Sequence, residues 1–219
     1  MSIDQGASTT MRTRVATFLG ALALASLPAF AQNLVVNGSF EDPAYPSSTN
    51  FPVAVTGWTI APDSGFEVWN NYAGPGANGP QYLELDVFTC NTISQAIPTV
   101  AGHKYLVRFA FGARPDVADN QVVVRWNGAQ IGSASADGTG QTAVVWTYHN
   151  ATATATGGSS TLSFTNVDTC DGVGAMLDDG SVVDQGGAAS VPTLGPPALA
   201  ALAAALAIAS LVLLRRRAR

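Results

Sequence analysis

Residues 121–135 read Gln-Val-Val-Val-Arg-Trp-Asn-Gly-Ala-Gln-Ile-Gly-Ser-Ala-Ser. Asn127-Gly128 is the dipeptide most typical of a two-residue type I′ turn, in which both central residues take a positive φ. The segment before the turn alternates, and one of its faces carries Val122, Val124 and Trp126. An alternating segment that ends in such a turn predicts a β-hairpin, so the fold contains antiparallel sheet.

Similar signals recur at intervals of about 8 to 14 residues through the middle of the chain, where no helical period of useful length occurs. The expected strands are Leu34–Val36, Gly57–Ile60, Phe66–Trp69, Gln81–Asp86, Thr92–Ile97, Lys104–Gly112, Gln121–Trp126, Gln130–Ser135, Ala143–Tyr148, Ser160–Phe164 and Ala175–Val183. Residues 42–52 and 73–80 are expected loops, and the Thr-Ala repetition at 151–156 is interpreted as a hairpin loop with strand ends. Many short strands without helices predict an all-β jelly-roll sandwich.

Charge is distributed unevenly along the 219 residues, of which 47% are apolar and 11% charged. Residues 32–189 contain four basic and 14 acidic residues, for a net charge of −10, whereas both ends are basic. A domain of this charge could not neutralise a run of phosphates, which excludes nucleic acid as a partner.

The N-terminal segment has the three parts of a secretory signal peptide. Arg12 and Arg14 precede an apolar stretch, Val15–Leu27, and Ala29-Phe30-Ala31 follows with small residues at the positions that signal peptidase reads. Cleavage is expected between Ala31 and Gln32. The alternative is a membrane anchor, although the apolar stretch is short for that role.

The C-terminal segment predicts a membrane anchor. Ala198–Leu214 is apolar except for Ser210 and is followed by Arg215-Arg216-Arg217-Ala218-Arg219. Seventeen residues make about 26 Å of helix, slightly less than the hydrocarbon thickness, and the arginines should remain cytoplasmic. The expected organisation is a signal peptide at 1–31, a β-sandwich domain at 32–185, a linker with a sorting motif at 186–197, a transmembrane helix at 198–214 and a cytoplasmic arginine cluster at 215–219.

Val191-Pro192-Thr193-Leu194, the apolar helix and the arginine cluster together resemble the IPTL-CTERM tail, which is similar to the PEP-CTERM sorting signals of Gram-negative bacteria. The usual Ile is replaced by Val191, and Pro-Pro-Ala stands where Trp-Gly is common. The resemblance implies a membrane-bound sorting enzyme of the exosortase type as a partner. A plain single-pass anchor is the alternative.

A second resemblance covers residues 33–184. Its segments, in chain order, are Asn33–Glu41, Gly57-Trp58, Gln81–Asp86, Ile93–Gln95, Gly102–Tyr105 and Met176–Asp179. Together they resemble the choice-of-anchor C family and the galactose-binding-like jelly rolls, which include several carbohydrate-binding modules. The resemblance implies a structural Ca²⁺ held by Glu41 and by one of Asp178 and Asp179, and carboxylates are suitable ligands for this ion. Ordinary solvated acids are the alternative.

Cys90 and Cys170 are the only two cysteines. In an exported chain an even number of cysteines favours a disulfide, with two buried free thiols as the alternative.

Aromatic and amide side chains gather at one expected strand end, in Trp69-Asn70-Asn71-Tyr72. An aromatic ring beside amide donors is a candidate platform for a sugar, and a loop packed over the edge of the core is the alternative. Trp146 and Tyr148 form a second, weaker candidate.

Glu84 and Asp86 share one strand face, an arrangement that would suit the two catalytic carboxylates of a glycosidase. Laminarinase-like jelly rolls carry Glu-x-Asp-x-x-Glu on one strand, but here Thr89 stands in place of the last Glu, which disfavours hydrolysis.

The sequence therefore predicts a non-enzymatic, exported domain that binds extracellular polysaccharide and is either anchored in the inner membrane facing the periplasm or sorted to the cell surface. A structural or adhesive protein of the envelope or biofilm matrix, without a small ligand, is the alternative.

Overall fold

The computed structural model describes residues 32–47, 49–52, 54–62 and 65–187, and a few positions between 200 and 215. Residues 1–31, with the expected signal peptide and Ala31 of its cleavage site, lie outside the described residues. So do the sorting motif Val191-Pro192-Thr193-Leu194 and most of the expected transmembrane helix at 198–214. In the part of the chain that is described, no helix is long and apolar enough to cross a membrane.

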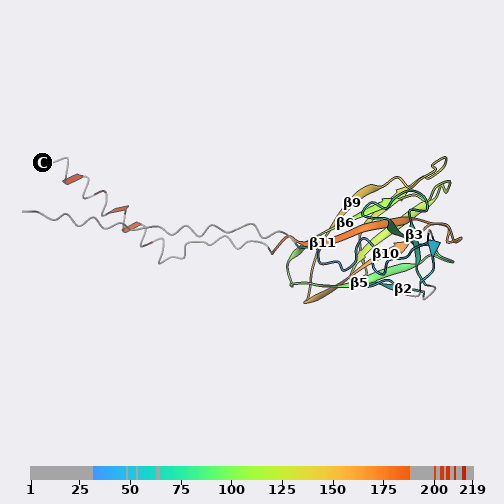
Figure 1. Ribbon diagram of the computed structural model, residues 1–219. Helices are drawn as coiled ribbons and strands as arrows, with labels where there is room; N and C mark the ends of the chain where they lie inside the picture. Colours follow the sequence, from blue (N-terminus) through green and yellow to red (C-terminus); the bar gives the residue numbers. More distant parts are fainter. Residues whose placement is uncertain are drawn as a thin grey trace, which may run out of the picture. The chain divides into compact units, whose positions relative to one another are not determined.

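Residues 32–187 form two antiparallel sheets packed face to face, which confirms the predicted all-β jelly-roll sandwich (Figure 1). The six-stranded sheet has the order β1 (Thr49–Asn50), β3 (Glu67–Asn70), β4 (Gln81–Glu84), β11 (Met176–Asp184), β6 (Lys104–Gly112) and β9 (Thr147–Thr154). The five-stranded sheet has the order β2 (Thr59–Ala61), β5 (Thr92–Pro98), β10 (Ser159–Asn166), β7 (Asn120–Trp126) and β8 (Ala129–Ala136).

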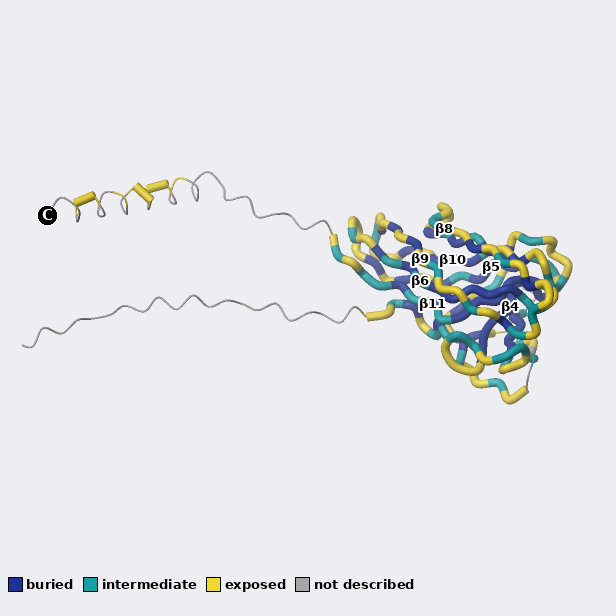
Figure 2. Tube along the Cα trace, turned by 90° about the horizontal axis from the view of Figure 1, so that it is seen from above, coloured by how far each residue is buried: buried dark blue, intermediate teal, exposed yellow. Residues whose placement is uncertain are grey.

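The core fills the space between the two sheets, where Figure 2 shows the buried segments in dark blue. Alternation along the strands supplies it, because successive side chains of a strand point to opposite faces. On β6 the buried aromatic residues Tyr105, Phe109 and Phe111 alternate with Leu106 and Arg108, as the sequence pattern predicted. Such close alternation fixes which face of each strand points outward.

The hairpin predicted at Asn127-Gly128 is confirmed. Both residues have a positive φ, 51° and 82°, and Trp126 pairs with Ala129 across the turn. A type I′ turn needs these angles at both central positions, which explains why Asn and Gly occupy them.

The expected strand at Leu34–Val36 is wrong. Asn33 makes only an isolated bridge to Val183, and residues 36–39 form a turn. Asn37 has a φ of 52°, and its side-chain oxygen accepts the N–H of Asp42 at 3.0 Å. An Asn side chain that closes a turn in this way competes with sheet pairing.

The boundaries of β9 and the loop expected at 42–52 also need correction. A strand was expected at Ala143–Tyr148 and a loop at 151–156, but β9 runs from Thr147 to Thr154. Ala151 and Ala153 are buried, whereas the threonines beside them are exposed. This alternation of small apolar and β-branched residues suits a strand at the edge of a sheet. The short edge strand β1 lies inside the segment that was expected to be a loop.

The predicted disulfide between Cys90 and Cys170 is confirmed. Cys90 lies in the connection from β4 to β5, and Cys170 lies in the connection from β10 to β11. Each of these connections crosses from one sheet to the other, so the disulfide joins two crossovers of the sandwich.

Candidate ligand-binding surface

The outer face of the six-stranded sheet carries a second apolar cluster, separate from the core. Its members are Trp69, Tyr82, Val144 and Met176, with Ala73 and Trp146 packed against them. The loop 71–80 (the platform loop) and the segment 141–146 cover this cluster. Val144 donates its N–H to Ala73 O at 2.9 Å, and Trp146 Nε1 donates to Pro75 O at 3.0 Å. The aromatic residues therefore hold a loop against the sheet.

The four predicted ligand-binding residues lie where β3 passes into the platform loop, but they differ in exposure. Trp69 is only 2% exposed and donates its indole N–H to Glu67, so its ring faces are closed to a ligand. Tyr72 is 58% exposed, and its ring meets that of Trp69 edge to face at a centroid distance of 4.6 Å. Asn70 donates to Tyr45 O, and Asn71 is exposed. Trp69 therefore supports Tyr72, which is the accessible ring.

Two carboxylates anchor the other end of the platform loop. Asp178 is fully buried and accepts the N–H of Asn78 at 2.9 Å and that of Asp179 at 2.6 Å. Burial raises the pKa of Asp178 to about 7, although these backbone donors oppose the shift. Glu41 accepts the N–H of Gln81 at 2.8 Å, and burial raises its pKa as well.

Oxygen atoms converge where these carboxylates meet the loop. A Cβ on Gly76 would lie 2.8 Å from Asp178 Oδ2, 2.8 Å from Gly79 O and 2.9 Å from Gln81 O. A Cβ on Gly79 would overlap Glu41 Oε1. Carboxylate and carbonyl oxygens gathered in this way fit the ligand set that Ca²⁺ takes in proteins. No three His, Cys, Asp or Glu side chains in the described ranges are placed to hold a metal ion, so the backbone carbonyls would have to contribute.

Asp179, the other residue predicted as a possible Ca²⁺ ligand, has different partners. One of its oxygens accepts the side-chain N–H of Asn78 at 2.8 Å, and the other accepts the Tyr148 hydroxyl at 2.8 Å. Arg108 Nη1 lies 3.5 Å from Asp179, and the guanidinium lies 3.5 Å above the ring of Tyr148. Asp179 therefore orders a surface aromatic group, and Asp178 is the member of the pair that lies beside Glu41 and the carbonyls.

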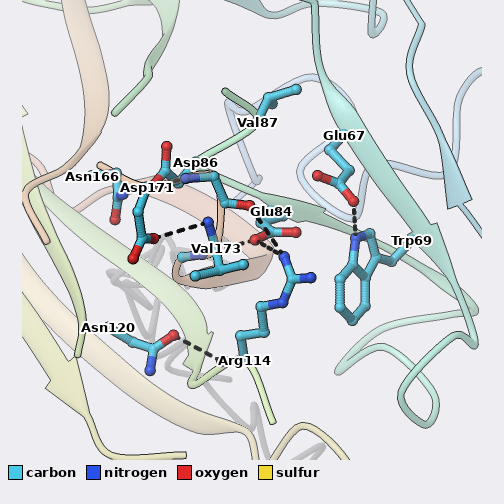
Figure 3. A network of polar contacts seen from close by, with 12 residues as sticks. Glu67, Trp69, Glu84, Asp86, Val87, Arg114, Asn120, Asn166, Asp171 and Val173 are labelled. Atoms are coloured by element: carbon cyan, nitrogen blue, oxygen red, sulfur yellow. Dashed lines mark hydrogen bonds and ion pairs between the residues drawn. The ribbon is translucent and has the colours of Figure 1, made fainter. Parts of the chain in front are cut away.

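A buried polar network lies at the ends of β3 and β4, shown in Figure 3. Glu84 pairs with Arg114, accepts the N–H of Gly174 at 2.8 Å, and lies opposite Glu67 in the strand register. Burial raises the pKa of Glu84 to about 8, and Glu67 adds to the shift while Arg114 opposes it. The Arg114 guanidinium also lies 5.1 Å above the ring of Trp69.

The geometry of this network does not suit glycoside hydrolysis by Glu84 and Asp86. Their exposed fractions are 2% and 0%, so neither carboxyl group is open to a substrate. The two carboxyl groups of a glycosidase must flank the scissile bond of a bound substrate. The pair instead belongs to the polar interior at the end of the sandwich.

Sequence reasoning missed three contributors to this surface. Arg108 was placed on the outward face of its strand, but its contact with Tyr148 depends on the pairing of β6 with β9. The carbonyls of Gly79 and Gln81 carry no side-chain signal. Arg114 lies two residues after the end of β6, and its approach to Glu84 depends on the packing of segments far apart in sequence. The alternation on β6 was the only available pointer to Arg108.

No family model matches the chain. Among curated proteins, a multifunctional-autoprocessing repeats-in-toxin protein of Vibrio cholerae serotype O1 is 30% identical over 157 residues, which is 68% of this chain. The chain spans only about 3% of the length of that relative.

Several solved structures are similar in fold. An arabinose-bound α-L-arabinofuranosidase, MgGH51, matches 71% of this chain and 26% of its own with a TM-score of 0.51 and 18% identity. A family 61 carbohydrate-binding module in complex with β-1,4-galactotriose matches 71% of this chain and 100% of its own (TM-score 0.47, 17% identity). A family 35 carbohydrate-binding module from Clostridium thermocellum matches 62% and 98% (TM-score 0.43, 17% identity). The likeness to the arabinofuranosidase shows a shared sandwich fold and nothing more.

Proposed function

We propose that this domain is a non-catalytic module that binds extracellular polysaccharide on the outer face of its six-stranded sheet. The observation that carries the proposal is the presence of two exposed aromatic side chains on that face. Tyr72 is 58% exposed and Tyr148 is 40% exposed, and both belong to the ordered surface around the platform loop. Exposed rings held by their neighbours lose little entropy when a ligand stacks on them.

Polar groups beside the two tyrosines supply the directional contacts that a sugar needs. Asn71 is exposed next to Tyr72, and Arg108 and Asp179 flank Tyr148. Sugar rings present apolar C–H faces and a rim of hydroxyl groups, so an aromatic face with amides and charges around it matches them. Glu84 and Asp86 take no part, because they are buried.

We further propose that Ca²⁺ binds between Glu41, Asp178 and the carbonyls of Gly79 and Gln81. The support is the convergence of their oxygens around Gly76 and Gly79. When bound, the ion would offset the burial of Asp178 and fix the platform loop that carries Tyr72. Its role is structural, so we expect Ca²⁺ removal to weaken glycan binding without abolishing the fold.

A glycan array probed with the full chain tests the proposal, followed by titration calorimetry on any glycan that binds. We expect Tyr72→Ala and Tyr148→Ala each to weaken the affinity for that glycan by about tenfold or more, which corresponds to about 1.4 kcal/mol. Phe88→Ala is the matched control, since Phe88 is a 70% exposed aromatic residue outside the surface. Equal loss in all three variants, or no glycan signal at all, would contradict the assignment.

One observation favours the alternative of a structural or adhesive protein without a small ligand. Phe51 and Phe88 are 57% and 70% exposed, and their rings stack at a centroid distance of 6.1 Å. Two apolar rings exposed together favour contact with another protein surface. Concentration-dependent self-association that is lost in Phe88→Ala, together with a blank glycan array, would favour this alternative.

The proposed location rests on the sequence. A signal peptide cleaved between Ala31 and Gln32 would export the domain, and the tail with Val191-Pro192-Thr193-Leu194 would anchor it or present it to an exosortase-like enzyme. Intact mass of the protein from membrane and medium fractions tests both steps. A mass that includes residues 1–31 in both fractions would overturn the export.

A further inference from the structure

A group of buried oxygens at the disulfide-bearing end of the sandwich lacks partners. Glu84 Oε2, Asp86 Oδ1, Asn166 Oδ1 and Asp168 Oδ2 are each buried and accept no hydrogen bond from any described residue. A buried oxygen without a donor costs free energy, and a carboxylate costs more than a neutral amide. Four such atoms close to one segment indicate a partner that these residues themselves do not supply.

Gly174, which precedes β11, is the common neighbour of these side chains. Its N–H is donated to Glu84 at 2.8 Å. A Cβ on Gly174 would lie 2.6 Å from Asp86 Cβ, 3.0 Å from Asp168 Oδ2 and 3.0 Å from Asn166 Nδ2. The four side chains therefore surround one short stretch of backbone, beside the end of β4 that Figure 3 shows.

Negative charge at this place is only partly balanced. Arg114 pairs with Glu84, but in the described ranges neither Asp86 nor Asp168 takes part in an ion pair. Asp86 uses its other oxygen to accept the N–H of Gly172 at 3.0 Å and is fully buried. Burial raises the pKa of Asp168, the backbone N–H of Cys170 and the Asn166 amide oppose the shift, and Asp86 and Asp119 add to it.

We propose that Asp86, Asn166 and Asp168 form a binding site for a divalent cation of the calcium type. Two carboxylates and an amide supply hard oxygen ligands, and the carbonyls of the surrounding loop can complete the coordination. Asn166 is 1% exposed and Asp86 is fully buried, so these two ligands are already desolvated. The site would be distinct from the one proposed at Glu41 and Asp178, because the two share no residue.

The site also has a structural consequence. Asp168 lies two residues before Cys170, and its oxygen accepts the N–H of Cys170 at 3.3 Å. The Asn166 amide donates to Asp168 at 2.6 Å and lies 3.6 Å from Cys90 Sγ. A cation here would tie the end of β4 to the same crossover that the disulfide holds.

A count of bound Ca²⁺ tests the proposal. The full chain is stripped with EDTA, dialysed against Ca²⁺ at about pH 7.5 and analysed for metal per chain. We expect two ions in the unmodified protein, and a weakening of one site by about tenfold or more in Asp168→Asn, which removes one ligand charge. Asp168 is partly exposed, so this variant should fold even where Asp86→Asn does not.

Two further variants separate the outcomes. Asp178→Asn should remove the other ion and leave this one, so failure at Glu41 and Asp178 is distinguishable from failure here. Asp119 is an exposed carboxylate that raises the pKa of Asp168 but is not one of the proposed ligands, so Asp119→Asn should bind as many ions as the unmodified protein. If Asp168→Asn binds Ca²⁺ as tightly as the unmodified protein, Asp168 is not a ligand and the proposal is wrong.

Hydrogen exchange gives an independent readout. Added Ca²⁺ should slow exchange of the amides between Asp168 and Gly174, and the protection should be absent in Asp168→Asn. A protected segment that is unchanged by the substitution would also overturn the site.

Discussion

The outer faces of the two sheets differ sharply in what they carry. On the six-stranded sheet, Trp69, Tyr82 and Met176 are buried beneath the platform loop. On the five-stranded sheet, the outward residues of β10 are Thr161, Ser163 and Thr165, and no aromatic cluster among the described residues covers them. The second face makes a shallow groove of about 480 Å³ lined by residues such as Thr59, Ser94 and Thr161.

Both faces belong to sheets that share one core, so the core does not account for the difference. A plain hydroxyl-rich face satisfies a β-sandwich, because one side of each sheet can remain solvated. The large aromatic residues on the outward face of the six-stranded sheet are buried because the platform loop covers them. The outer face of the six-stranded sheet therefore carries an aromatic cluster and a covering loop that a β-sandwich does not require.

The largest effect on stability is expected from a substitution that disrupts the apolar cluster around Trp69. Trp69→Ala should lower the free energy of unfolding by about 3–5 kcal/mol, because it leaves a cavity under the platform loop. Thr161→Ala, the control on the other face, should change it by less than about 0.5 kcal/mol. Urea unfolding of both variants measures the contrast, and similar values would show that the two faces are equivalent.

Removal of the disulfide tests a feature that is common to both sheets, because the bond joins two connections between them. Replacing Cys90 and Cys170 with Ser should lower the free energy of unfolding by about 4 kcal/mol, because it frees a long loop in the unfolded chain. Since the bond joins crossovers between the sheets, we expect hydrogen exchange to rise on strands of both. Loosening confined to one sheet would contradict this.

A pH series distinguishes the faces by their buried acids. The folded-state pKa of Asp178 is raised to about 7 from 3.8, so the metal-free domain is stabilised by a proton there. This contribution is complete below the unfolded pKa and is lost as the pH rises through about 7. Melting temperatures in EDTA should therefore fall between about pH 4 and pH 8.

Asp178→Asn should make the decline of melting temperature with pH less steep. The rest of the decline should persist, because the pKa of Glu84 is also raised, to about 8. Added Ca²⁺ should raise the melting temperature of the unmodified protein most at high pH, where Asp178 is ionised. A melting temperature that rises with pH in EDTA would contradict the assignment of a buried, protonated Asp178.

The smallest effect concerns one hydroxyl group. Tyr148→Phe removes the hydrogen bond to Asp179 but keeps the ring beneath Arg108. We expect a loss of stability of about 0.5–1.5 kcal/mol and a glycan affinity that falls less than in Tyr148→Ala. Ser163→Ala on the other face is the control, and thermal unfolding with calorimetric binding separates the two quantities.

The sequence predicted the fold because local signals and long-range packing agree along most strands. The turn at Asn127-Gly128 and the alternation on β6 each point to the structure that forms. Leu34–Val36 failed because the Asn37 side chain stabilises a turn, and β9 was displaced because alanines and threonines give a weak pattern.

The candidate site was less predictable for a different reason. Trp69 and Tyr72 are three residues apart, but sequence alone did not reveal that one is buried and the other exposed. That outcome depends on the platform loop, which is held by Asp178, 100 residues from its hydrogen-bond donor Asn78. Contacts across such distances, and ligands supplied by backbone carbonyls, leave no pattern in the local sequence.

The bridge between Asn33 and Val183 bears on how this domain can be used as a building block. Leu34 donates to Val182 O at 2.8 Å, so the first and last described segments of the sandwich run side by side. A domain with adjoining ends can be placed inside a loop of a host protein without stretching it, and its connectivity can be rearranged by circular permutation. Joining residues 187 and 32 through a short linker and opening the chain at Asn127-Gly128 should therefore preserve both faces, which makes this sandwich a portable unit rather than a terminal appendage.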